Sequence, residues 1–183
     1  VDQENAEGGQ AAACLEGWSN CAGTKGLKLA GENSATSSGD GCIFREFTTV
    51  NSASGEGNKT IIGNNLVMMA YTHVAHNCIV GNNVIMSNVA TLAGHVTVED
   101  RAVIGGLAAV HQFCKIGRSA MIGGQSHVKQ DVPPFMIVSG QPAYVFGLNS
   151  VGVACSGRPQ ATASQPNTAF RTLSRSGPSL QVA

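Results

Sequence analysis

Residues 61–132 consist of twelve consecutive hexapeptides, which read IIGNNL, VMMAYT, HVAHNC, IVGNNV, IMSNVA, TLAGHV, TVEDRA, VIGGLA, AVHQFC, KIGRSA, MIGGQS and HVKQDV. The second residue of every hexapeptide is aliphatic, from Ile62 to Val128, and the sixth is usually small or β-branched. A period of six fits neither the 3.6-residue period of an α-helix nor the two-residue alternation of a strand. A fixed short period instead predicts a solenoid.

The hexapeptides predict an all-β fold, a parallel β-helix shaped as a triangular prism. Three hexapeptides would close one coil of eighteen residues, with a short strand and a turn in each. The aliphatic second residue would point inward, and the small sixth residue would fill the corner. Glycines that directly follow the inward residue, such as Gly63 and Gly81, are consistent with tight backbone at the corners. Successive coils would stack about 4.8 Å apart.

The composition agrees with a thin prism filled by aliphatic side chains. The chain has 183 residues, 23 of them glycine, and only 5% aromatic residues, which suits one domain. Its formal net charge of +0 gives no reason to expect binding to nucleic acid. Since no long apolar run and no signal-peptide pattern is present, we expect a cytoplasmic protein without membrane insertion.

The sequence divides into three parts. We expect residues 1–41 to be a poorly defined segment that includes degraded coils, residues 42–150 to form the β-helix, and residues 151–183 to form a short irregular tail that is partly helical around residues 169–176. Residues 51–60 predict a polar loop.

The ends of the repeat are set by two signals. Phe44 and Val50 keep the phase of the hexapeptides, so the first clear coil is expected near Cys42. The run DVPPF after Gln130 predicts the end of the repeat, because proline cannot donate a ladder hydrogen bond.

All five histidines lie within the hexapeptides. His76 occupies the fourth position of its hexapeptide, and steps of eighteen residues lead to Gly94 and then to Gln112. These three residues should therefore stack on one edge of the prism. The flanking histidines of that edge are His73, His95 and His111, whereas His127 falls outside the cluster.

This column suits acyl transfer. A neutral imidazole can take a proton from a substrate hydroxyl, and a glycine N–H beside it can hold a developing oxyanion. A zinc site is the alternative reading of clustered histidines, but it would need three of them to converge on one ion. The close pair, His73 and His76, does not have the spacing found in hexapeptide carbonic anhydrases.

Four segments carry a resemblance to a known family: THVAHNC (72–78), TLAGHV (91–96), IGGLAAVHQFCKIG (104–117) and QDVPPFM (130–136). They closely resemble the UDP-N-acetylglucosamine acyltransferases that begin lipid A synthesis. The resemblance covers residues 43–150. It implies a left-handed β-helix and a homotrimer with sites between subunits. It also implies that a 3-hydroxyacyl chain passes from acyl carrier protein to the 3-hydroxyl of UDP-N-acetylglucosamine, without a cofactor or a metal.

The resemblance also implies residue roles. His76 matches the general base and Gly94 the oxyanion-hole amide. Gly124 matches the position that limits the length of the acyl chain. The other matches fall on residues that bind or line the substrate groove, and these are Lys28, His73, Asn77, His95, His111, Gln112 and Asn149.

Three departures from the family keep alternatives open. Many relatives carry Asp where this chain has Asn77, and Gly26 replaces the aspartate of a substrate loop. The segment GVACSG (152–157) lacks the basic residues that grip phosphate and the carrier protein in relatives. A non-catalytic hexapeptide scaffold and an inactive fragment therefore remain as alternatives, and the clustered histidines leave a metal-dependent hexapeptide enzyme as a third. The choice between a 3-hydroxyl and a 3-amino acceptor also stays open.

Overall fold

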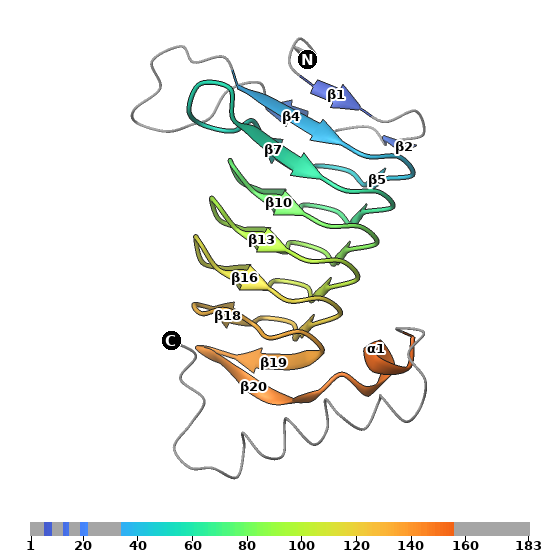
Figure 1. Cartoon of the computed structure of the whole chain (residues 1–183), viewed down its shortest axis with the longest axis vertical. Coiled ribbons are helices and arrows are strands. Elements are labelled where there is room, and N and C mark those ends of the chain that lie inside the picture. The colour runs from blue at the N-terminus through green and yellow to red at the C-terminus, as the bar shows by residue number, and fades with distance from the viewer. Residues whose placement is uncertain (1–5, 9–12, 15–18, 22–33, 156–183) are drawn as a thin grey trace.

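The computed structural model describes residues 6–8, 13–14, 19–21 and 34–155, which build a stack of triangular coils (Figure 1). Three parallel sheets run along the stack, and each coil contributes one strand to each sheet. The first sheet contains β1 (Ala6–Gly8), β4 (Ala35–Ser38), β7 (Lys59–Ile62), β10 (Ile79–Val80), β13 (Thr97–Val98) and β16 (Lys115–Ile116).

The other two sheets form the remaining sides of the prism. The second contains β2 (Ala13–Cys14), β5 (Ile43–Phe44), β8 (Val67–Met68), β11 (Ile85–Met86), β14 (Val103–Ile104), β17 (Met121–Ile122), β19 (Met136–Gly140) and β20 (Ala143–Leu148). The third contains β3 (Ser19–Cys21), β6 (Thr49–Asn51), β9 (His73–Val74), β12 (Thr91–Leu92), β15 (Ala109–Val110) and β18 (His127–Val128).

The predicted register and the predicted inward residues are both confirmed. Val80 pairs with Val98, and Val98 pairs with Ile116, so each step between hexapeptides along a sheet advances by eighteen residues. All twelve second-position side chains are at most 3% exposed, and the predicted small sixth-position residues are buried as well. Together they form one continuous apolar cluster from Cys42 to Val138.

The corners are made by the fifth residue of the hexapeptide rather than by glycine. In the first eleven hexapeptides this residue has a positive φ, for example 56° at Asn83 and 64° at Val89. Its backbone N–H donates to the preceding coil, as Asn83 does to the carbonyl of Asn64 at 2.8 Å. The backbone conformation is unfavourable for a β-branched residue such as Val89, so the ladder bonds must stabilise it.

The glycines that follow the inward residue have a different role from the one that we predicted. Their φ angles are not positive; they permit neighbouring coils to approach each other. A Cβ on Gly63 would lie 2.7 Å from the carbonyl carbon of Gly81, and one on Gly105 would lie 2.6 Å from the nitrogen of Gly124. Glycine is required there by the space between coils.

The ladder begins before Cys42. Strand β4 pairs with β7, and β1, β2 and β3 pair with β4, β5 and β6. The hexapeptide pattern missed β4 because its inward residue is Thr36, which is buried and donates a hydrogen bond to the Ser52 hydroxyl at 3.4 Å.

The predicted polar loop lies between β6 and β7. Thr49 pairs with His73, so this coil is six residues longer than the standard coil. Lys59 and Thr60, which we had placed in the loop, already belong to β7. The predicted helix around residues 169–176 lies outside the described residues.

The proline pair ends the hexapeptides but not the ladder. Val132 still forms a parallel bridge with Ile116, and β19 pairs in parallel with β17. Strand β20 then returns antiparallel to β19 and is followed by α1 (Ser150–Ala154). This hairpin covers the C-terminal end of the stack (Figure 1). No helix in the described part of the chain has the length and apolarity that crossing a membrane requires.

The inward register can be tested with two adjacent residues of β10. Val80 is 1% exposed, whereas Ile79 is 48% exposed. We expect Val80→Asp to prevent folding, because it places a carboxylate in the prism with no partner. The matched variant Ile79→Asp should fold with a stability change of about 1 kcal/mol or less. Circular dichroism and thermal unfolding check both, and a folded Val80→Asp protein would show that the register is wrong.

Candidate active site

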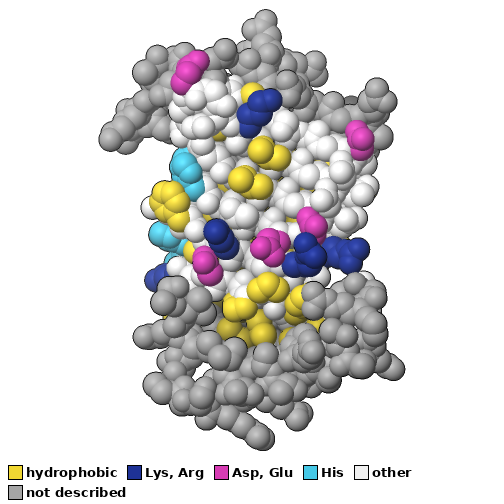
Figure 2. Space-filling view, in the orientation of Figure 1, with side chains coloured by type: hydrophobic (Ala, Val, Ile, Leu, Met, Phe, Trp, Pro, Cys, Tyr) yellow, Lys and Arg dark blue, Asp and Glu magenta, His cyan; other side chains and the backbone are white. Residues whose placement is uncertain are grey.

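One edge of the prism, between the third and first sheets, carries the predicted column of His76, Gly94 and Gln112. We call it the histidine edge. The coils are joined there by backbone hydrogen bonds from His95 N to His76 O at 3.0 Å and from Phe113 N to Gly94 O at 3.2 Å. Figure 2 shows histidine side chains gathered along one margin of the molecule. The eighteen-residue register therefore stacks these three residues as the sequence predicted.

The imidazole of His76 lies directly over Gly94. A Cβ placed on Gly94 would be 2.6 Å from Cε1 and 2.7 Å from Nε2 of His76. Any side chain at this position would therefore displace the ring. Glycine is needed at residue 94 so that the imidazole can lie against the backbone of the next coil.

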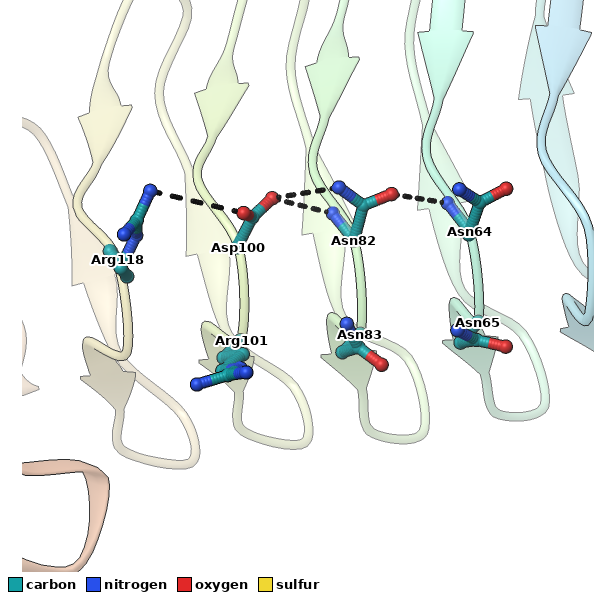
Figure 3. A pocket seen from close by; sticks show the side chains of 7 residues that line it. All are labelled: Asn64, Asn65, Asn82, Asn83, Asp100, Arg101 and Arg118. Carbon is teal, nitrogen blue, oxygen red and sulfur yellow. Dashed lines mark hydrogen bonds and ion pairs between the residues drawn. The ribbon is translucent and has the colours of Figure 1, made fainter. Parts of the chain in front are cut away.

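A second edge, between the first and second sheets, shows how a side chain can satisfy the fourth-position amide of the preceding coil. We call it the asparagine edge, after Asn64 and Asn82 (Figure 3). Asn64 N donates to Asn82 Oδ1, and Asn82 N donates to Asp100 Oδ1, each at 2.8 Å. Each side chain thus accepts from the amide of the coil before it. This edge also lines an open groove of about 470 Å³.

The histidine edge lacks this arrangement. Within residues 34–155 the N–H of Gly94 donates to no acceptor, and the side chain of Gln112 in the next coil does not take the place of Asp100. Gly94 is buried, and a buried amide without a partner is costly. Beside an imidazole, such an amide is suited to an oxyanion that forms during a reaction.

Asn77 fixes the orientation of the His76 ring. Asn77 Oδ1 lies 2.9 Å from His76 Nδ1. Asn77 has a φ of 59°, a conformation that asparagine tolerates better than most residues. An amide oxygen can only accept a hydrogen bond, so Nδ1 of His76 carries the proton and Nε2 keeps its lone pair. A neutral His76 is therefore arranged as a base at Nε2.

The flanking histidines differ in their surroundings. The ring of His95 makes an edge contact with His76, with centroids 5.2 Å apart, and stacks on Phe113 at 4.9 Å. Partial burial of His95, and then the positive charge that His76 can carry, lower the pKa of His95.

His73 Nδ1 lies 2.7 Å from the Thr49 hydroxyl. His111 is exposed, with Nδ1 3.2 Å from the carbonyl oxygen of Gln112.

Two predicted binding residues lie away from this cluster in a single chain, and a third is not among the described residues. Gly124 lies on the third edge, between the second and third sheets. Asn149 caps α1: its Oδ1 accepts from Gly152 N at 3.0 Å, and its Nδ2 donates to Ser119 O at 2.9 Å. Lys28 lies outside the described residues. Among the residues that the structure describes, no three His, Cys, Asp or Glu side chains gather as a metal ion would require.

Three residues at this edge were missed by sequence reasoning. Phe113 covers His95, Ser54 contacts the amide of Asn77, and the Thr60 hydroxyl accepts from Asn77 N at 2.9 Å. The six-residue interruption of the repeat was the available signal for Ser54 and Thr60, because it lies one coil before Asn77.

The low pKa of His95 predicts a pH effect on stability. A depressed folded-state pKa gives stability that is present above the unfolded value of about 6.5 and is lost as the pH falls through the folded value. We expect His95→Asn, which suits the positive φ, to lose less thermal stability than the wild type between pH 7.5 and pH 5. Equal losses in thermal unfolding of the two proteins would contradict this assignment.

The chain is similar to a set of acyltransferases. Residues 131–183 match the profile of a family described as UDP-N-acetylglucosamine O-acyltransferase, domain 2. An acyl-[acyl-carrier-protein]–UDP-N-acetylglucosamine O-acyltransferase of Gloeothece citriformis is 45% identical over 157 residues, which is 86% of this chain and 57% of that protein. The Aquifex aeolicus protein of the same name is 53% identical over 151 residues, 82% of this chain and 58% of that protein. The chain thus spans little more than half the length of these relatives.

Solved structures of the same group of acyltransferases are similar to this chain in fold. The UDP-N-acetylglucosamine acyltransferase of Campylobacter jejuni superimposes with a TM-score of 0.83 and 34% identity, over 96% of this chain and 76% of that chain. The Bacteroides fragilis enzyme gives a TM-score of 0.90 and 31% identity, over 95% of this chain and 68% of that one. The predicted left-handed parallel β-helix is thereby confirmed. The chain belongs to the UDP-N-acetylglucosamine acyltransferase family.

Proposed function

We propose that the chain transfers a 3-hydroxyacyl group from acyl carrier protein to the 3-hydroxyl of UDP-N-acetylglucosamine, the first step of lipid A synthesis. The observation that supports this most directly is the pairing of two groups on the histidine edge. The neutral ring of His76 leaves Nε2 without a proton, and the ring lies against the unpaired amide of Gly94. Membership of the family and the names of the similar proteins support the choice of substrates.

The reaction assigns one task to each group. His76 Nε2 takes the proton of the sugar hydroxyl while that oxygen attacks the thioester carbonyl of the acyl donor. The carbonyl oxygen becomes negative, and the Gly94 N–H stabilises it by a hydrogen bond. When the tetrahedral intermediate collapses, the C–S bond breaks and His76 returns its proton to the departing thiolate of the carrier protein. The reaction is not a redox reaction, so it needs no electron-carrying cofactor.

The acyl groove is proposed to lie between chains of a homotrimer. Gly124 and His76 are on different edges of one prism, so they can line one groove only if the third edge of a neighbouring chain faces the histidine edge. Exposed apolar side chains follow that third edge and favour such packing: Tyr71 at 58%, Val89 at 41% and Leu107 at 56% exposure. Gly124 would then limit the length of the acyl chain.

The remaining family positions are proposed to bind the sugar nucleotide or to line the groove. They are Lys28, His73, Asn77, His95, His111, Gln112 and Asn149. A cytoplasmic location agrees with both substrates.

A non-catalytic scaffold of the same fold is the second candidate. It is favoured by the segment GVACSG (152–157), which has no basic side chain where phosphate would be gripped. Weaker phosphate binding should raise KM rather than remove the chemistry at His76. Steady-state kinetics therefore separate a weakened enzyme from a scaffold.

The first test is transfer from 3-hydroxyacyl carrier protein to UDP-N-acetylglucosamine, with the 3-amino analogue of the sugar assayed beside it. We expect an oxygen-linked product and a loss of about 10²–10⁴-fold in kcat for His76→Ala. His127→Ala is the matched control, because His127 lies outside the cluster, and it should keep wild-type kcat. A folded wild-type protein without turnover on either acceptor would favour the scaffold.

The role of Gly94 is tested by adding one methyl group. Gly94→Ala should lower kcat by about 10²-fold. The added Cβ would lie 2.6 Å from Cε1 of His76, so the imidazole must move away from its position. Gly147→Ala is the control, since Gly147 lies on β20 of the second sheet and its added Cβ would meet no atom within 4 Å. Equal activity of the two variants would remove Gly94 from the site.

A further inference from the structure

The loop between β6 and β7 contacts the histidine edge through Ser54. Ser54 N donates to Asn77 Oδ1 at 2.8 Å, and Asn77 Nδ2 donates to Ser54 O at 3.0 Å. The hydroxyl of Ser54 also reaches Asn77 Oδ1, at 2.9 Å. The amide of Asn77 is thus paired with the main chain of Ser54 by two hydrogen bonds of opposite direction.

These two bonds allow one orientation of the Asn77 amide. A backbone N–H can only donate and a backbone carbonyl can only accept, so Oδ1 must face the nitrogen of Ser54 and Nδ2 its oxygen. In a flipped amide, Nδ2 would face the N–H of Ser54, donor against donor. Oδ1 would face the carbonyl oxygen of Ser54, acceptor against acceptor. The orientation follows from main-chain chemistry and does not depend on which side chain residue 54 carries.

The same orientation determines the proton on His76. With Oδ1 held in place, His76 Nδ1 must donate to it at 2.9 Å. A flipped amide would instead offer Nδ2 to the imidazole, and Nδ1 would have to accept. The proton would then move to Nε2, and the base would be lost. The position of the main chain at Ser54 therefore determines which nitrogen of His76 can act.

The loop itself is built to keep Ser54 in position. Asn58 Nδ2 donates to Ser54 O at 2.8 Å, and Asn58 N donates to Gly55 O at 3.1 Å. Gly55 has a φ of 92°, and a Cβ there would lie 2.5 Å from Asn58 Nδ2. From the other side, the buried Thr60 hydroxyl accepts from Asn77 N at 2.9 Å.

We infer that Ser54 is a positioning residue for the reaction: its main chain holds the amide of Asn77 so that His76 keeps the Nδ1–H tautomer. This inference rests on the proposed role of His76 as the base. It also gives the asparagine at residue 77 a physical reason, because a carboxylate there would present an oxygen, not a donor, to the carbonyl of Ser54. An amide held in this way orients the ring without a negative charge.

The test compares the imidazole tautomer of His76 in variants of the full chain by long-range ¹H–¹⁵N NMR correlation. Deleting residues 54–59 removes the six extra residues and lets Thr60 follow Ala53, which restores an eighteen-residue coil. Ser54→Pro removes both donors to Asn77 Oδ1, the N–H and the hydroxyl, and keeps the carbonyl of residue 54. Glu56→Ala is the matched control, because Glu56 is an exposed residue of the same loop.

We expect the Nδ1–H tautomer in the wild type and in Glu56→Ala, and a mixture of tautomers in the deletion variant and in Ser54→Pro. Transfer activity should fall in parallel, with kcat about fivefold to tenfold lower and KM unchanged. A folded deletion variant that keeps the Nδ1–H tautomer would overturn the inference, as would a wild-type Nε2–H tautomer. Because the tautomer is read without substrate, a missing acyl transfer activity would count against the proposed function alone.

Discussion

From β7 to β18 each coil lies on the one before it through backbone hydrogen bonds, and these bonds fix a step of eighteen residues along each sheet. The step puts residues of equal position in the hexapeptide on one line, so the core, the corners and the edges are each a column of equivalent residues. The coils can lie this close because glycine follows the inward residue at positions such as Gly63 and Gly105. In such a fold, a functional site is formed where one column carries different residue types at the same hexapeptide position.

The edges show what this exchange does. On the asparagine edge, Asn82 and Asp100 accept from the amides of the preceding coils, so the amides of Asn64 and Asn82 are satisfied by side chains of the same column. On the histidine edge the equivalent positions hold His76 and Gly94, so an imidazole takes the space and an amide stays without a partner in the described structure. At Gly94, no side chain of the next coil accepts a hydrogen bond from the amide, so the stability that such a bond would contribute is absent. The same amide is therefore available to a substrate.

The sequence predicted the features that repeat, because periodicity carries them. Val80 and its equivalents were placed inside, and His76, Gly94 and Gln112 were placed in one column. Features that depend on single contacts were not predictable. Thr36 conceals a strand because its inward side chain is polar, and Asn149 caps a helix that has no repeat. The hydrogen bonds between Ser54 and Asn77 join a loop that has no period to a hexapeptide. No sequence pattern indicates that these two residues are in contact. Gly124 and His76 lie on different edges of one chain, so the proposed groove requires a second chain.

A structure of the chain bound to its proposed product, UDP-N-acetylglucosamine acylated on the 3-oxygen, tests the central assignment most directly. We expect the 3-oxygen of the sugar about 2.6–3.2 Å from His76 Nε2 and the acyl carbonyl oxygen about 2.7–3.1 Å from Gly94 N. A product that binds elsewhere, for example in the groove of the asparagine edge, would contradict it. So would a product at the histidine edge whose carbonyl oxygen points away from Gly94.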